Sequence, residues 1–155
     1  MKVYFIFDVK EQFISLYQNN YRVLYNILRQ IYYLDREEVN YAYTLFRQLV
    51  NTIDKNTIDR DIFLKLHRDI PYSKRGNVHY INNLYKDEVS RLTIKNSYIR
   101  LETEQLNSSF FEVLKKYSNN FFVCDFKNYN YFFLNSYNLM GTLTSSWYHL
   151  IIMIQ

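Results

Sequence analysis

The sequence predicts an α+β protein, a single domain in which a mainly antiparallel sheet is packed by helices, in the order β-α-α-(irregular)-β-β-α-β-β. Three observations support this fold class. Runs of β-prone residues occur in pairs separated by short polar turns, helical periodicity lies between these pairs, and no regular βαβ alternation indicates a parallel sheet. The 155 residues, of which 48% are apolar and 22% are charged, suit one hydrophobic core.

The chain begins with a predicted strand from Lys2 to Phe7, which is rich in Val, Ile and aromatic residues and has no helical period. We expect Asp8 to cap the helix that follows, with Glu11 completing a capping box. From about Val9 the apolar residues follow a 3.6-residue period, although Asn19–Asn20 would divide one long helix into two. These apolar residues are Phe13, Leu16, Tyr17, Leu24, Ile27, Leu28 and Ile31.

The capping pattern recurs at Asp35 with Glu38 and at Ser109 with Glu112, and each pair predicts the start of a helix. The helix after Asp35 is expected to continue to about Asn51, because apolar residues keep the helical spacing that far. They include Val39, Tyr43, Phe46, Leu49 and Val50.

The segment from Thr52 to Asn83 has a weaker pattern and is predicted to be irregular. Within it, Asp59–Leu66 fits either a helix or a strand. Pro71 and Gly76 favour a connection without regular structure nearby.

Two hairpins complete the predicted sheet. The β-prone runs Val89–Ile94 and Tyr98–Leu101 flank the polar turn Lys95–Ser97. After the helix at Ser109, Phe121–Cys124 and Tyr131–Leu134 form the second pair of strands.

Composition excludes several classes of protein. With only 2 Gly and 1 Pro, the chain has no dinucleotide-binding fingerprint and no glycine-rich phosphate loop. The single Cys124 cannot form an intrachain disulfide, and Asp8, Lys10 and Glu11 interrupt the apolar start too early for a secretory or membrane segment. We therefore expect a cytoplasmic protein.

Catalytic and metal-binding constellations are weak. His67, His79 and His149 have no spacing typical of metal ligands, and Cys124 lies within an apolar strand pattern that favours a structural role, so we expect no metal and no cofactor. Asp8 and Asp125 follow predicted strands and would suit paired carboxylate catalysis, but capping and turn formation explain them sufficiently. The sequence therefore does not favour an enzyme.

Nucleic-acid binding is the main alternative function. The net charge is +4, but 19 basic residues are interleaved with 15 acidic ones, which is a mild bias. The aromatic run Tyr129–Phe133 would suit base stacking, whereas alternation along a strand would place Tyr131 and Phe133 on one face and Phe132 on the other, inside a core.

Phe13 and Tyr17 are the candidate contact residues. They are four residues apart and share one face of the first helix. Within a continuous helix they belong to the apolar arc and to the core. If the helix breaks at Asn19–Asn20, the same two rings are free to act as aromatic anchors of a protein interface.

The chain resembles the sporulation inhibitor of replication (SirA) family. Its N-terminal part is similar in the aromatic strand followed by Lys10–Phe13 and Tyr17. The longest match is the block Ser109–Phe110–Phe111–Glu112–Val113–Leu114–Lys115–Lys116, followed by Ser118, Phe121, Asp125–Phe126, Tyr131 and Leu134–Asn135. The resemblance covers residues 1–135, and the uncharged tail 136–155 departs from it.

The resemblance implies a non-enzymatic inhibitor of replication initiation that binds the N-terminal domain of the initiator DnaA during sporulation. It also implies a contact surface at Phe13 and Tyr17, with Gln48 on the following helix as the third contact and Arg47 as its alternative. We therefore expect a cytoplasmic monomer that binds DnaA, with no direct contact with nucleic acid or membrane. A small protein that acts directly on DNA is the alternative.

Overall fold

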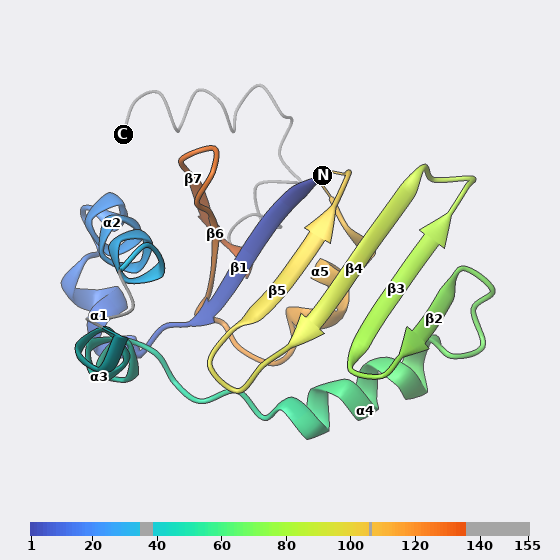
Figure 1. Ribbon diagram of the computed structural model, residues 1–155, viewed down its shortest axis with the longest axis horizontal. Helices are drawn as coiled ribbons and strands as arrows, with labels where there is room; N and C mark the ends of the chain where they lie inside the picture. The colour runs from blue at the N-terminus through green and yellow to red at the C-terminus, as the bar shows by residue number, and fades with distance from the viewer. Residues whose placement is uncertain (35–38, 106, 136–155) are drawn as a thin grey trace.

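The computed structural model describes residues 1–34, 39–105 and 107–135 (Figure 1). The strands of the described part are β1 (Lys2–Asp8), β2 (Tyr72–Arg75), β3 (Val78–Asn83), β4 (Glu88–Ile94), β5 (Ile99–Thr103), β6 (Phe121–Asp125) and β7 (Asn130–Phe133). The helices are α1 (Glu11–Leu16), α2 (Tyr21–Tyr32), α3 (Val39–Leu49), α4 (Lys55–Leu66) and α5 (Ser109–Leu114). The predicted α+β class is confirmed.

All seven strands belong to one sheet in the order β2-β3-β4-β5-β1-β6-β7, and every pairing is antiparallel. The N-terminal strand β1 is internal to this sheet. Ile6 pairs with Ile99 of β5 on one side and with Val123 of β6 on the other. The first residues of the chain thus join segments that are far apart in the sequence.

Helices cover both faces of the sheet, because successive side chains of a strand point to opposite faces. Tyr4 and Ile6 of β1 contribute to a core beneath α4 and α5, whereas Phe5 and Phe7 contribute to a core beneath α1, α2 and α3. We call these the α4–α5 core and the α1–α3 core. The α4–α5 core includes Ile58, Ile62, Leu92, Phe110, Phe111 and Phe121, and the α1–α3 core includes Leu24, Tyr25, Leu28, Leu49, Phe122, Cys124 and Phe126.

The predicted cap at Asp8 is wrong. Strand β1 extends through Asp8, and α1 begins only at Glu11 with Lys10 as its N-cap and no side-chain cap. The Asp8 carboxylate instead accepts a hydrogen bond from the Ser118 hydroxyl at 2.7 Å. Pairing with β6 keeps the backbone extended for longer than the capping pattern suggested.

The other capping predictions have different outcomes. Ser108, one residue earlier than expected, is the N-cap of α5, and its hydroxyl accepts from the Phe110 N–H at 3.2 Å. Asp35 and Glu38 lie outside the described residues, while α3 is described from Val39 onward.

The prediction of an irregular segment from Thr52 to Asn83 is wrong. This segment contains α4, β2 and β3, and the ambiguous stretch Asp59–Leu66 is helical. Asp54 caps α4 by accepting from the Thr57 N–H. Gly76 has a φ of +58° in the turn between β2 and β3, so the glycine indicated a hairpin turn and not a long loop.

The predicted hairpins are confirmed as β4–β5 and β6–β7. The first predicted helix is divided at Asn19–Asn20 into α1 and α2, which is one of the two outcomes that the sequence left open. Among the residues that the structure describes, no helix is both long enough and apolar enough to cross a membrane. The expected tail, 136–155, lies outside the described residues.

Candidate partner-binding surface

Helix α1 is short; it contains Phe13, and its C-cap is Tyr17, the other aromatic residue that the sequence singled out. It ends after Leu16, where the Tyr17 N–H donates to the Phe13 carbonyl at 3.0 Å. Asn20 then has extended φ and starts α2 without a side-chain cap. The break uncouples α1 from the direction of α2, so the apolar arc of a single continuous helix does not exist.

The break leaves α1 on the surface of the α1–α3 core. No residue of α1 is fully buried. Phe13, Ile14 and Tyr17 are half-buried and pack against this core, while Leu16 is 67% exposed. Each of the two aromatic rings therefore has one part in contact with the core and another part open to solvent.

Leu16 is a candidate that the sequence analysis placed in the apolar arc. It lies three residues after Phe13 and beside Tyr17, and its exposure follows from the helix break. We call Phe13, Leu16 and Tyr17 together the α1 surface. A helix break at Asn19–Asn20 is the sequence signal from which the exposure of Leu16 could have been predicted.

Helix α3 lies beside α1, as Figure 1 shows. The Lys10 N–H donates to the Leu49 carbonyl at 2.9 Å, and Val9 forms an isolated antiparallel bridge with Val50. These contacts join the start of α1 to the end of α3. Leu49 and Val50 are buried at this junction.

Gln48 and Arg47 are both exposed in the last turn of α3. Gln48 precedes Leu49, whose carbonyl accepts from the Lys10 N–H, so this turn of α3 lies next to the start of helix α1. The Arg47 guanidinium lies over the Tyr43 ring at 5.5 Å from its centroid. Consecutive helical residues differ by about 100° in direction, so Arg47 and Gln48 face different surroundings.

The two carboxylates considered for catalysis do not meet. Asp8 pairs with Phe121 at one end of β6, and Asp125 is the last residue of that strand, about 13 Å further along at 3.3 Å per residue. Asp125 forms the turn as expected, since it accepts from the N–H and the side-chain amide of Asn128.

The surroundings of Cys124 and His67 indicate structural roles for both residues. Cys124 is fully buried in the α1–α3 core, and burial raises the pKa of its thiol well above the ordinary value. His67 caps the end of α4, and His149 lies outside the described residues. The described part of the chain holds no group of three or more residues suited to a metal ion.

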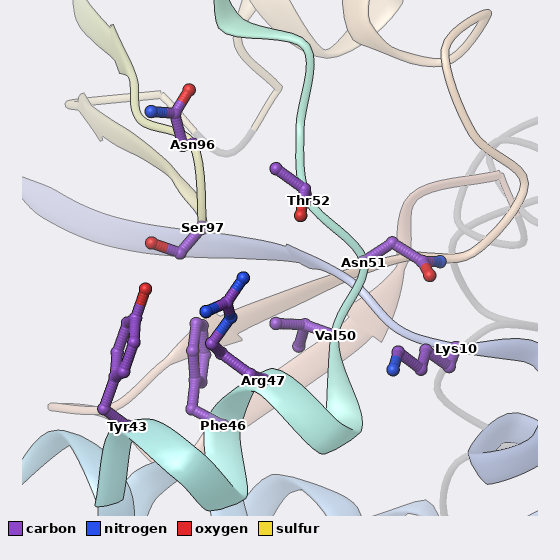
Figure 2. A pocket seen from close by; sticks show the side chains of 9 residues that line it. All are labelled: Lys10, Tyr43, Phe46, Arg47, Val50, Asn51, Thr52, Asn96 and Ser97. Atoms are coloured by element: carbon purple, nitrogen blue, oxygen red, sulfur yellow. The ribbon is translucent and has the colours of Figure 1, made fainter. Parts of the chain in front are cut away.

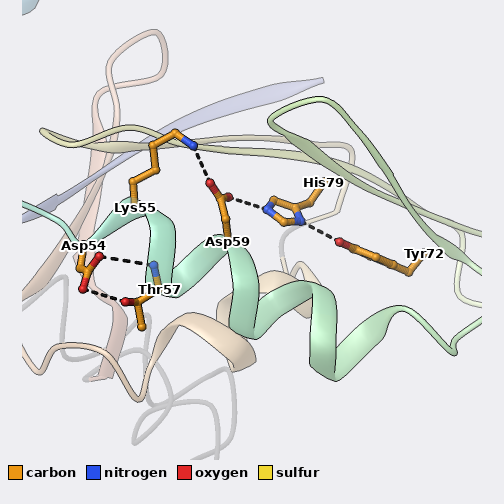
Figure 3. A network of polar contacts seen from close by, with 6 residues as sticks. All are labelled: Asp54, Lys55, Thr57, Asp59, Tyr72 and His79. Carbon is orange, nitrogen blue, oxygen red and sulfur yellow. Dashed lines mark hydrogen bonds and ion pairs between the residues drawn. The ribbon is translucent and has the colours of Figure 1, made fainter.

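His79 belongs to a buried polar network (Figure 3). Its Nε2 lies 2.7 Å from Asp59 Oδ1, and its Nδ1 lies 2.8 Å from the Tyr72 hydroxyl. A carboxylate can only accept, so Nε2 donates to Asp59 and Nδ1 accepts from Tyr72. Burial raises the pKa of Tyr72 to about 12, so the hydroxyl keeps its proton and donates.

The dense aromatic run at residues 129–133 begins with Tyr129 in the turn between β6 and β7 and continues through strand β7. Tyr131 and Phe133 pack against the α1–α3 core and Phe132 against the α4–α5 core, as strand alternation predicted. Tyr129 is 67% exposed, and the Arg29 guanidinium covers its ring at 4.4 Å. The run thus supplies core contacts to both faces and no row of open stacking surfaces.

The fold defines the class of the protein: it is an α+β protein with one antiparallel sheet, covered by α1–α3 on one face and by α4 and α5 on the other. A comparison with protein families identifies a match over residues 2–138 to the family described as sporulation inhibitor of replication protein SirA. The chain belongs to this family, whose name denotes inhibitors of replication during sporulation. A comparison with curated proteins gave no match.

Proposed function

We propose that this protein is a non-enzymatic inhibitor of replication initiation, which binds the N-terminal domain of DnaA through the α1 surface and Gln48. It acts in the cytoplasm of the sporulating cell as a monomer. The family match supports inhibition of replication, and the resemblance of Phe13, Tyr17 and Gln48 to the family's contact residues supports DnaA as the partner.

The state of Phe13 and Tyr17 is the observation that carries the proposal. Both rings rest on the α1–α3 core and are still partly open to solvent. A ring held in this way loses little conformational freedom on binding, which lowers the entropic cost of forming an interface. The exposed Leu16, three residues after Phe13, adds apolar area beside it.

Inhibition by this route requires occupancy alone. The N-terminal domain of DnaA supports self-assembly of the initiator and recruitment of the helicase. A protein seated on that domain hinders assembly at the origin without any chemical step. The tyrosine hydroxyl of Tyr17 and the amide of Gln48 are available to orient the two proteins, as polar groups do at the rim of an interface.

The first prediction concerns the α1 surface. Phe13→Ala and Tyr17→Ala are each expected to weaken binding of the DnaA N-terminal domain at least tenfold, about 1.4 kcal/mol, because each removes an aromatic anchor. Isothermal titration calorimetry with purified proteins measures the change. Since both rings are half-buried, thermal unfolding should show a loss well below the roughly 3–5 kcal/mol of a fully buried Phe→Ala change.

The matched control is Phe63→Ala, which removes an aromatic ring that is 41% exposed on α4. This variant should bind like the unchanged protein. Gln48→Ala should weaken binding, whereas Arg47→Ala should not. If Phe13→Ala and Tyr17→Ala bind normally while folded, the α1 surface is not the docking site; if the unchanged protein does not bind, DnaA is not the partner.

Nuclease treatment and a salt series separate this proposal from direct action on DNA. Phosphate contacts release counterions, so DNA binding loses affinity steeply with salt, whereas an aromatic-centred protein contact loses much less. Binding to DnaA should therefore survive removal of DNA and change little between low and moderate salt. A steep salt dependence with loss of binding after nuclease treatment would favour the DNA-binding alternative.

A further inference from the structure

A pocket of about 560 Å³ lies between α3 and the turn that joins β4 to β5 (Figure 2). It is separate from the α1 surface, because Phe13, Leu16, Tyr17 and Gln48 do not line it. Its walls come from the start of α1, the last turns of α3, the segment after α3 and the β4–β5 turn. The lining residues are Lys10, Tyr43, Phe46, Arg47, Val50, Asn51, Thr52, Asn96 and Ser97.

The charge of this lining has one sign. Lys10 and Arg47 are the charged residues among the nine, and none of the nine is acidic. Within the described ranges, neither side chain takes part in an ion pair. Figure 2 shows Arg47 extending from α3 toward Ser97, with the Lys10 amine directed to the pocket from the other side. Among the described residues, the pocket therefore presents two cations without a counterion.

Neutral donors and an aromatic wall complete the lining. Asn51 and Asn96 carry side-chain amides, and Thr52 and Ser97 carry hydroxyls, which are all able to donate hydrogen bonds. Tyr43 is 53% exposed, and its ring supports the Arg47 guanidinium. The Phe46 ring is held in place by an edge contact with Phe7 of β1, at a distance of 5.6 Å between the ring centroids.

Backbone hydrogen bonds hold the walls of the pocket together. The Lys10 N–H donates to the Leu49 carbonyl at 2.9 Å, and the Asn51 N–H donates to the Asp8 carbonyl at 2.7 Å. On the other side, the Ile53 N–H donates to the Asn96 carbonyl at 2.7 Å. These bonds connect the lining segments directly, so the pocket is formed before any ligand arrives.

We propose that this pocket binds the phosphate group of a small phosphorylated organic molecule. A phosphate monoester carries close to two negative charges at neutral pH, which matches the positive charges of Lys10 and Arg47. Its three terminal oxygens accept several hydrogen bonds at once, as the surrounding amides and hydroxyls allow, whereas a carboxylate has one charge and two oxygens. The rest of the pocket is large enough for an organic group beside Tyr43 and Phe46.

This mode of phosphate binding differs from the glycine-rich loops that the sequence excludes. Such loops cradle phosphate with backbone N–H groups, whereas here the donors are side chains on a helix, a connecting segment and a hairpin turn. The absence of a nucleotide-binding fingerprint is therefore compatible with this site. Phe13, Leu16, Tyr17 and Gln48 do not line the pocket, so ligand binding there can be measured separately from DnaA binding.

Three probes test the proposal at constant ionic strength: phenyl phosphate, benzoate and inorganic phosphate. Chemical shifts of backbone amides, read by NMR, report the site and the affinity on the full chain. Phenyl phosphate is expected to bind saturably, to move the resonances of Asn96 and Ser97, and to bind at least tenfold more tightly than benzoate. Inorganic phosphate should bind at the same site and more weakly than phenyl phosphate, because it lacks the ring.

Arg47→Ala and Lys10→Ala should each weaken phenyl phosphate binding at least tenfold. The matched control is Arg60→Ala, which removes an exposed arginine of α4 that does not line the pocket. A lack of saturable binding, or equal binding by Arg47→Ala and the unchanged protein, would overturn the proposal. If benzoate bound as tightly as phenyl phosphate, the site would not be specific for phosphate. If inorganic phosphate bound as tightly as phenyl phosphate, the pocket would not contact the organic group.

Discussion

His79 shows how single residues secure this fold. Its side chain is fully buried between the helix α4 and the strands β2 and β3, yet both ring nitrogens have partners. Asp59 also forms an ion pair with Lys55, with 2.6 Å between Lys55 Nζ and Asp59 Oδ2. One buried imidazole thus links two elements that are 20 residues apart, and its protonation state contributes to stability.

Burial lowers the pKa of His79 below its ordinary value of 6.5, although the hydrogen bond that His79 donates to Asp59 opposes this effect. The folded state therefore binds a proton less readily than the unfolded chain. The contribution to stability is complete above about pH 6.5 and decreases as the pH falls toward the folded-state pKa. We predict that the free energy of unfolding decreases between pH 7.5 and 5.5.

Urea unfolding at several pH values measures this decrease. In His79→Gln the decrease should be smaller, because the titrating group is gone even though the variant is less stable. His67→Ala, which removes the exposed histidine at the end of α4, should keep the decrease of the unchanged protein. An identical pH profile for His79→Gln would show that other groups cause it.

At the residue scale, the sequence predicted the burial of side chains in strands, but it did not predict their hydrogen-bond partners from distant parts of the chain. Cys124 and the alternation at Tyr131, Phe132 and Phe133 were interpreted correctly, because strand patterns report burial directly. Asp8 was wrong because its partner Ser118 is 110 residues away. The network around His79 was missed for the same reason, since no local spacing indicates contacts between α4 and β3.

At the scale of elements, the helix α5 is fixed to the sheet by a buried carboxylate. Glu88 of β4 is 3% exposed and accepts hydrogen bonds from the Ser90 hydroxyl, the Ser108 hydroxyl, and both the N–H and hydroxyl of Ser109. The N–H and hydroxyl groups come mainly from the start of α5. Glu88 thus positions this helix over the α4–α5 core.

Glu88→Ala should lower the free energy of unfolding by about 3 kcal/mol, because it leaves several buried donors without their charged acceptor. The comparison is Glu112→Ala on α5. The Glu112 side chain is 72% exposed and pairs with Lys115, so its loss should cost about 0.5 kcal/mol or less. Chemical unfolding of both variants gives the two values, and similar losses would contradict the anchoring role of Glu88.

Elements with strong local signals were predicted and elements with weak signals were not. The hairpins β4–β5 and β6–β7 follow short polar turns and β-prone runs, so they were found. Helix α4 was ambiguous because its apolar residues do not form one stripe: Ile58 and Ile62 are buried, whereas Phe63 and Leu64 are exposed. The proposed interface depends on the break between α1 and α2, which the sequence allowed but did not decide.

At the scale of the whole molecule, the sheet divides the interior into two cores, and one of them packs against the α1 surface. The α1–α3 core supports the α1 surface, whereas the α4–α5 core supports none of the proposed contact residues. Phe122 and Phe110 are fully buried representatives of the two cores. Changes of equal size in the two cores should therefore have equal effects on stability and unequal effects on binding.

Phe122→Leu and Phe110→Leu are each expected to lower the free energy of unfolding by about 1–2 kcal/mol. Phe122→Leu should also weaken binding of the DnaA N-terminal domain about threefold or more, because α1 rests on the altered core. Phe110→Leu should leave the affinity unchanged. Chemical unfolding and calorimetry on both folded variants supply the comparison, and equal effects on binding would show that support of α1 is not local to one core.

The internal position of β1 in the sheet affects how the chain folds during its synthesis on the ribosome. The first strand to emerge requires β5 and β6 as neighbours, and the latter ends only at Asp125. Until β6 is available, β1 can pair only with β5 and has one unpaired edge in the nascent chain. The sheet is therefore complete only after Asp125 has been synthesised, and chaperones that shield extended apolar segments have the interval before that in which to act.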